Sequence, residues 1–351
     1  MFRRSGMKSN YAYMSAKVKA KKSNLLTEED YNKMLMMSVP EICHYIGESG
    51  YQQDMTELGA YFKGLDLLEY ATYLNMARIF NDLVKASQGE LRDMVTAYLK
   101  KWDYWNLKVI LRGKSYGLST KEIQQNLIPA GGLSADSLDR IGSIESEEAL
   151  ISAFAASNHI EIPADVLSLY RADKNLAALE DYLDGRYYTD LLASINKDST
   201  PTRLFNNYVR YEVDMINMET ILKLKLEDIP ADAIMGYFVP GGKDIDEKTA
   251  ANLAALENVD AVVNELATIE GYEEIKEIFV PGTNTIAKIS MALKKFHRQQ
   301  ALKFSHLYPL SVLPVVDYLI NKEIEVSNVR TIARGTESGL DRETIKELLV
   351  I

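Results

Sequence analysis

The stretch NLKVILRGK (residues 106–114) returns as NMETILKLK (217–225) and as NVRTIARGT (328–336), each copy 111 residues after the one before. We call each copy the signature. The copies share an asparagine, an isoleucine four positions on and a basic residue six positions on: Asn106, Ile110 and Arg112; Asn217, Ile221 and Lys223; Asn328, Ile332 and Arg334. Self-similarity at a fixed period indicates one structural unit built several times. The pattern predicts a repeat protein before it predicts an enzyme.

The apolar residues of the signature are spaced as on one face of a helix. Leu107, Ile110 and Leu111 lie at i, i+3 and i+4. The other two copies keep this spacing, so we expect three helices with the same buried side. The position two after the asparagine changes charge between copies and is predicted to face solvent: Lys108, Glu219 and Arg330.

Helix signals recur along the chain, and strand signals are scarce. Thr27, Ser38 and Ser119 each precede an acidic residue three positions on, as in a helix-capping box. Long helical patterns of apolar residues cover 65–83, 91–112, 175–195, 204–224, 286–302 and 311–334. Glycine pairs and a Pro-Gly pair mark breaks at 131–132, 241–242 and 281–282. The sequence predicts an all-α fold.

The 111-residue period divides the chain into units. We predict an N-terminal extension with the first helix over residues 1–23, then repeats over 24–134, 135–245 and 246–351. Each repeat is predicted to end with the signature helix, a short loop and a short helix. These short helices are expected to begin at Ser119, Pro230 and Asp341.

Composition narrows the class of protein. The formal net charge of −10 argues against a nucleic-acid-binding protein, because phosphate contacts need a surplus of Lys and Arg. The single cysteine, Cys43, excludes an internal disulfide framework and suits a reducing cytoplasm. No apolar run of about 18 residues occurs, so no direct transmembrane insertion is expected. The N-terminal ten residues lack the apolar core of a signal peptide, and Met7 is an alternative start.

Signals for catalysis are weak. Gly113-Lys114-Ser115 resembles the end of a phosphate-binding loop, but Lys108 stands where that loop needs its first glycine, and the segment is predicted to be helical. Cys43 and His44 would point about 100° apart on a helix and are predicted to be half-buried packing groups. The histidines show no metal-ligand spacing: His44, His159, His297 and His306. No catalytic, cofactor-binding or metal-binding residues are predicted.

Two roles are open for the polar residues of the signature. They could pack helices together and cap the backbone, or they could contact a partner. The asparagine and the basic residue six positions on lie about 120° apart on an ideal helix, so one flat partner would not touch both. This geometry favours packing.

Three segments resemble the C subunit of the archaeal A-type ATP synthase. They are YAYMSAKVKAKKSNLL (11–26), WNLKVILRGK (105–114) and PLSVLPVVDYLINKEIEVSNVRTIARG (309–335), and they fall in the family's order. This family includes the C subunit of bacterial V/A-type ATPases and the d subunit of eukaryotic V-ATPases. The resemblance runs from Tyr11 to the last residues, and only the residues before Tyr11 depart from it.

The resemblance implies a funnel of three similar helical domains around a pseudo-threefold axis. Such a subunit has no active site and no cofactor, and it lies peripherally on the cytoplasmic face of the cell membrane. It is a rotor socket whose expected partners are the membrane proteolipid ring and the central-stalk subunits. Through it, ion-driven rotation would be coupled to ATP synthesis, whether the ion is a proton or sodium.

Two other functions compete with this one. A helical repeat scaffold of another multiprotein complex would also bind partners through concave surfaces. Co-purification with ring and stalk subunits would separate it from the rotor socket. A nucleotide-dependent enzyme comes third, since it rests only on the tripeptide at 113–115.

Overall fold

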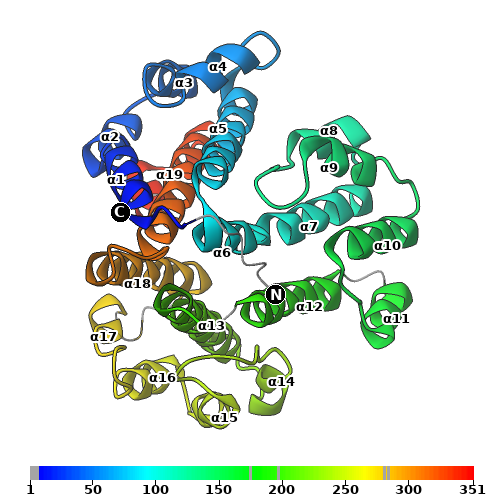
Figure 1. The fold of residues 1–351 in the computed structure, drawn as a ribbon, viewed down its shortest axis with the longest axis vertical. Helices are drawn as coiled ribbons and strands as arrows, with labels where there is room; N and C mark the ends of the chain where they lie inside the picture. Colours follow the sequence, from blue (N-terminus) through cyan, green and yellow to red (C-terminus); the bar gives the residue numbers. More distant parts are fainter. Residues whose placement is uncertain (1–7, 174–175, 196–197, 280–281, 283–284) are drawn as a thin grey trace. The chain divides into compact units, whose positions relative to one another are not determined.

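The computed structural model describes residues 8–173, 176–195, 198–279, 282 and 285–351, and within these ranges it is built of helices and loops without a strand (Figure 1). The predicted all-α fold is confirmed. Met7, Asn175 and Pro281, which the sequence patterns singled out, lie outside the described residues.

The helices in chain order are α1 (Tyr11–Lys22), α2 (Glu28–Met34), α3 (Val39–Gly47), α4 (Gln52–Leu58), α5 (Gly64–Ala86), α6 (Gly89–Leu99), α7 (Lys101–Ser115), α8 (Thr120–Gln125), α9 (Ala135–Gly142), α10 (Glu147–Asn158), α11 (Ala164–Asp173), α12 (Ala177–Ser194), α13 (Thr200–Leu226), α14 (Ala231–Met235), α15 (Glu247–Ala255), α16 (Val259–Leu266), α17 (Ile275–Ile278), α18 (Ile286–Leu307), α19 (Leu313–Glu337) and α20 (Arg342–Glu347).

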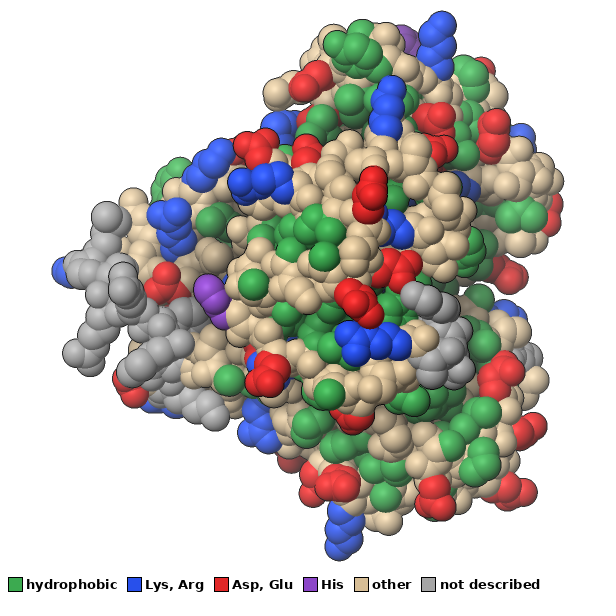
Figure 2. Space-filling model, turned by 90° about the vertical axis from the view of Figure 1, so that its right-hand side faces the viewer, with side chains coloured by type: hydrophobic (Ala, Val, Ile, Leu, Met, Phe, Trp, Pro, Cys, Tyr) green, Lys and Arg blue, Asp and Glu red, His purple; other side chains and the backbone are tan. Residues whose placement is uncertain are grey.

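The described chain groups into two compact units. Unit 1 contains residues 11–38 and 192–351, and unit 2 contains residues 39–191, together with residues 8–10. The grouping differs from the three predicted repeats, whose boundaries stay a prediction. Charged side chains of both signs are interspersed on the face drawn in Figure 2.

Local sequence signals explain most helix ends. Thr27 and Ser119 are N-caps with complete capping boxes, made with Asp30 and Glu122. The three short helices after the signatures, α8, α14 and α20, are capped by the predicted residues Ser119, Pro230 and Asp341.

The predicted continuous helix over 91–112 is wrong, because the chain breaks at Lys100 into α6 and α7. At this point two backbone hydrogen bonds join residues that are three apart. The Lys100 N–H donates to the Ala97 C=O, and the Asp103 N–H donates to the Lys100 C=O. This is the tighter 3₁₀ pattern, which redirects a helix without glycine or proline.

Unit 1 is organised around α19. Helices α18, α1 and α2 pack against it, and α13 packs against α18. Nearly all of α19 is buried, including charged residues such as Asp317, Lys322 and Glu325. Buried charges need bonded partners, because desolvation alone costs several kcal/mol per ion. The polar contacts of α19 are therefore central to how the unit holds together.

Candidate functional site: the polar anchors of the signature helices

The three signature helices, α7, α13 and α19, bury the same apolar face. Its nine residues are at most 3% exposed: Leu107, Ile110, Leu111, Met218, Ile221, Leu222, Val329, Ile332 and Ala333. The shared buried side predicted from the spacing is confirmed.

Each signature asparagine is buried and binds the main chain 22 residues later. The Asn106 amide donates to Ile128 C=O (2.7 Å) and accepts from Ile128 N–H (2.8 Å). Asn217 makes the same two bonds to Val239, at 2.9 Å each. Asn328 makes them to Val350, at 3.0 Å each. An amide side chain carries both a donor and an acceptor, so one residue satisfies both polar groups of a buried peptide segment.

A second polar site, missed in the sequence, lies three positions before each asparagine. Asp103, Asp214 and Glu325 share the 111-residue spacing and are 0%, 0% and 2% exposed. We call these three residues the acid anchors. They accept hydrogen bonds from backbone amides elsewhere in the chain. The repeated D/E-x-x-N pattern was visible in the sequence and could have identified them.

The first two acid anchors bind the loop that ends their own repeat. Asp103 accepts from the amides of Gly132 (2.9 Å) and Leu133 (3.0 Å). Asp214 accepts from the amides at 243–245, at 2.9–3.0 Å, and from the Tyr272 hydroxyl at 2.9 Å.

Glycine lets these loops approach the carboxylates. A Cβ atom on Gly131 or Gly242 would lie 2.2 Å from the Oδ1 atom of Asp103 or Asp214. One glycine of each pair, Gly131 and Gly242, is therefore required by contact distance at its anchor.

The third acid anchor binds the start of the chain instead. Glu325 Oε2 accepts from the Leu26 amide at 2.6 Å, and its Oε1 accepts from the buried Lys322 amine at 2.6 Å. No glycine stands at residues 24–28, and glutamate has one methylene group more than aspartate. The longer side chain reaches a backbone that does not come as close.

All three acid anchors hold equivalent points of the fold. The last amide that each one binds belongs to the residue just before a helix N-cap: Leu133 before Ser134, Ile245 before Asp246, and Leu26 before Thr27. These N-caps start α9, α15 and α2, which are the first short helices of the predicted repeats. Each signature helix thus holds the beginning of a repeat other than its own.

The electrostatics of the two aspartate anchors differ from those of an exposed carboxylate. Burial raises the pKa of Asp103 above its ordinary value, while the amides of Leu133 and Gly132 act in the opposite direction. Burial raises the pKa of Asp214 in the same way, against its backbone amides and Tyr272. Burial, with the Asp214 charge, also raises the pKa of Tyr272. Tyr272 therefore stays a neutral donor to the carboxylate.

The position two after the asparagine was predicted to face solvent; this is wrong for Arg330, which is buried, while Lys108 and Glu219 are half-buried. The Lys108 amine lies 2.6 Å from Asp184 of α12 with its side chain only 13% exposed, and Arg330 is 7% exposed. Glu219 accepts from Ser290 of α18. The charge at this position varies because its helix neighbours vary.

The basic residues of the signature lie in the last turns of their helices and closer to solvent. Arg112 Nε donates to Glu180 of α12 (2.6 Å), Lys223 pairs with Glu219 (2.6 Å), and Arg334 is exposed. The structure brings together the asparagine and the isoleucine of each copy on the buried side, and it places the basic residue away from them. Contact of these basic residues with a partner stays a prediction.

The signature helices also end alike. The C=O groups of Gly113, Leu224 and Gly335 each accept from an amide five residues on. The residue before each donor has a positive φ: 70° at Gly117, 56° at Asp228 and 71° at Gly339. This is the left-handed helix cap that favours glycine, and Asp228 adopts it without being glycine.

The other residues considered for phosphate binding, catalysis or metal binding lie in different parts of the described chain. Gly113 and Lys114 lie inside α7, so the tripeptide forms no phosphate loop. The predicted half-burial of His44 is wrong, since its side chain is 81% exposed and faces Glu48, while Cys43 is half-buried. His297 bonds to Tyr208 and Glu212. Across the described ranges, no group of three or more His, Cys, Asp or Glu side chains is placed to hold a metal ion.

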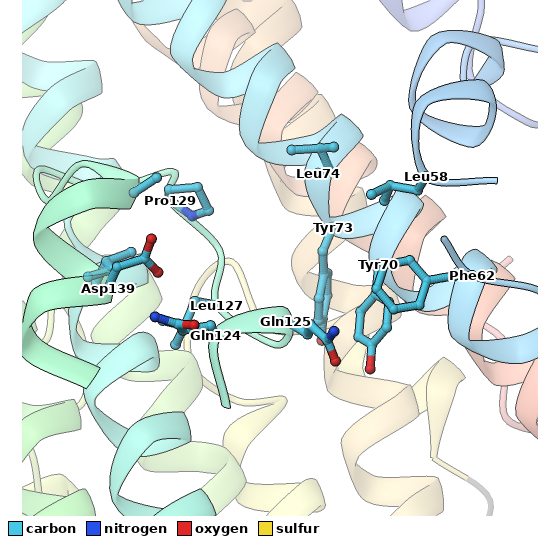
Figure 3. A pocket seen from close by; sticks show the side chains of 12 residues that line it. Leu58, Phe62, Tyr70, Tyr73, Leu74, Gln124, Gln125, Leu127, Pro129 and Asp139 are labelled. Carbon is cyan, nitrogen blue, oxygen red and sulfur yellow. The ribbon is translucent and has the colours of Figure 1, made fainter. Parts of the chain in front are cut away.

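A pocket of about 210 Å³ opens in unit 2 between α4–α5 and α8–α9 (Figure 3). Tyr70, Tyr73 and Phe62 form its aromatic side, with the amides of Gln124 and Gln125 across from them. The remaining lining is apolar except for one carboxylate: Leu58, Leu74, Leu127, Pro129, Ala135, Leu138 and Asp139. This lining holds no nucleophile next to a base.

Among the helices of the described residues, none combines the length and the apolar character needed to cross a membrane.

Comparison with known proteins agrees with the resemblance seen in the sequence. Residues 14–348 match the family model of the ATP synthase (C/AC39) subunit. The A-type ATP synthase C subunit of Methanococcoides burtonii is 37% identical over 99% of this chain and 96% of its own length. Those of Methanosarcina mazei and Archaeoglobus fulgidus are 36% and 33% identical, over 98% and 99% of this chain and 93% and 98% of their own lengths. The chain belongs to the C/AC39 subunit family of ATP synthases.

Proposed function

We propose that this ATP synthase subunit is a rotor socket. Its three repeats would close around one axis, rest on the membrane proteolipid ring and receive the foot of the central stalk. Rotation driven by ions in the ring would then reach the subunits that make ATP. The chain would act peripherally on the cytoplasmic face of the membrane and would catalyse no reaction of its own.

The observation that carries this proposal is the bond between Glu325 and the Leu26 amide. The first two acid anchors hold the residues just before repeat 2 and repeat 3, as expected for neighbours in sequence. The third anchor links repeat 3 back to repeat 1. A linear array of repeats would leave its last anchor without such a partner, whereas a closed set of three uses all its anchors.

The burial of the anchors suits a part that transmits torque. One charge that crosses 100 mV supplies about 2.3 kcal/mol, so several steps must be stored before one ATP forms. A coupler must not yield at its joints under that load. Buried carboxylates that are bonded to main-chain amides, three at Asp214, two at Asp103 and one at Glu325, resist sliding, because a displaced joint leaves desolvated donors without acceptors.

The test is a bridging assay with purified ring and purified stalk. The chain is expected to sediment with each of them alone and to hold the two together. Glu325→Gln is expected to weaken bridging, because the joint between the last and first repeats loses its carboxylate. Glu337→Gln, at an exposed position of the same helix, is the matched control and should bridge like the parent chain.

One outcome would overturn the proposal. If the chain stays with the stator when the complex is stripped, while the ring keeps the stalk, the socket function is excluded. Binding to neither ring nor stalk would instead support a scaffold in another part of the complex.

A further inference from the structure

The turn between α18 and α19 displays apolar side chains to solvent. Leu307 and Leu310 are 68% and 65% exposed, and Tyr308 between them is 37% exposed. The turn that joins α5 to α6 in unit 2 has no such group, since it consists of the buried Ser87 and the exposed, polar Gln88. The exposed cluster is therefore not a general property of the repeat.

The turn is held in a fixed shape. The Ser311 hydroxyl donates to Tyr308 C=O (2.7 Å) and accepts from Leu313 N–H (3.2 Å). Tyr308 stacks on Phe304, with ring centroids 6.5 Å apart. Val312 beyond the turn is fully buried. The leucines are thus presented by an ordered backbone, not by a frayed loop.

Lysines lie on both helices near this turn, in a chain whose net charge is −10. Lys303 is four residues before Leu307 on α18, α1 has four lysines, and neither helix has an acidic residue. Lys22 at the end of α1 bonds to Asp317 near the start of α19 (2.8 Å), so the last turn of α1 lies close to this end of α19. Lys19 and Lys21 belong to that last turn.

Two acidic groups near the turn are engaged. Asp317 is buried and bonded to Lys22, and Glu274 is bonded to Lys303 (2.6 Å). The surface at this end therefore combines lysines with leucine and tyrosine side chains.

We propose that this end of unit 1, formed by Lys19, Lys21, Leu307, Tyr308 and Leu310, rests in the headgroup layer of a membrane that contains anionic lipids. Leucine side chains enter the acyl boundary, tyrosine suits the interface, and lysine stems reach anionic headgroups. The inference rests on the proposed function, which places the chain at a membrane.

Size favours a membrane over a protein at this turn. A stable protein interface buries about 800 Å² on each partner. Three partly exposed side chains offer much less than that, whereas a bilayer takes up single apolar groups one at a time. Each such group adds to membrane binding without a matching pocket.

The test uses the full chain with vesicles of phosphatidylcholine alone and vesicles that also contain phosphatidylglycerol, followed by sedimentation. The chain is expected to bind the anionic vesicles and to lose binding at high salt. Leu307→Ser with Leu310→Ser should weaken binding about tenfold or more. Lys19→Gln with Lys21→Gln should weaken it about fivefold for each lysine.

Leu169→Ser with Tyr61→Ser is the matched control, because both side chains are similarly exposed in unit 2, at 56% and 80%. This variant should bind like the parent chain. All these positions lie at the surface, and circular dichroism would confirm that each variant is folded.

Three outcomes would overturn the inference: no binding of the parent chain to anionic vesicles, full binding by the leucine variant, or equal loss in the control. If the leucine variant no longer binds the purified ring, and no form of the chain binds vesicles, the surface belongs to a protein partner. The bridging assay separates the two proposals: intact bridging without vesicle binding removes only this inference, and vesicle binding without bridging removes only the socket.

Discussion

Asp214 and Glu325 occupy the same place in successive signature helices, yet they hold different kinds of joint. Asp214 binds a loop that follows its own helix in the chain, so covalent continuity supports the contact. Glu325 binds the Leu26 amide, 299 residues away in sequence. There the carboxylate is assisted by Lys322 and by the Lys22–Asp317 pair. A joint without chain continuity is thus strengthened by charge.

The largest effect is expected from Glu325→Gln. The change removes the carboxylate that binds the 3% exposed Lys322 amine, and breaking a buried pair costs about 3–5 kcal/mol. Urea unfolding would measure this loss. The rate of amide hydrogen exchange should also rise in α1 and α2, because the chain does not connect these helices directly to α19. If protection of α1 and α2 is unchanged, the joint does not depend on this carboxylate. Glu337→Gln is the control.

Asp214→Asn should cost less, about 2–3 kcal/mol, because its amide group no longer accepts from all its backbone donors and Tyr272. Faster hydrogen exchange should stay confined to residues 243–245, since the continuous chain keeps α15 in place. Exchange that spreads through α15 and α16 would mean that the two joints depend on their anchors to the same degree.

The asparagines allow a finer comparison. Asn217→Asp keeps the acceptor for Val239 N–H but loses the donor to its C=O, with an expected loss of about 2 kcal/mol. Asn328→Asp makes the same change at Val350, which is 3% exposed, and should cost a similar amount. Thermal unfolding of the two variants would measure both losses, and a clearly smaller loss at one site would contradict the equivalence of the two asparagines.

The smallest effect concerns the left-handed caps. Asp228→Gly should stabilise the chain by about 1 kcal/mol, because glycine has no steric penalty at φ 56°. Gly339→Ala should destabilise it by a similar amount at φ 71°. Chemical denaturation would show both signs. A destabilising Asp228→Gly would mean that the aspartate side chain contributes more than its backbone strain costs.

Periodic features of the fold could be predicted from the sequence. The signature helices and their buried faces follow from apolar spacing, and capping boxes mark two helix starts. The N-caps Ser134 and Ser146 lie 112 residues before the N-caps Asp246 and Asn258, and this spacing is also visible in the sequence.

One local feature and several tertiary contacts could not be predicted. The break at Lys100 arises from a local change in hydrogen bonding in a segment without glycine or proline. Arg330 looked solvated because a charged side chain gives no sign of burial until its neighbours are known. The acid anchors were overlooked because their partners are main-chain amides, which no side-chain pattern in the sequence reveals.

The binding of main-chain amides by the acid anchors has an evolutionary consequence. Asp103, Asp214 and Glu325 recognise peptide groups, which every residue except proline provides. The linker residues that supply these amides can therefore mutate without losing recognition, provided that the main chain keeps its path. Selection would act on the helix that holds the carboxylate and on Gly131 and Gly242, which touch it, and leave the rest of the linkers free to drift. After duplication, three copies could diverge until only scattered identities remained, while their joints stayed interchangeable.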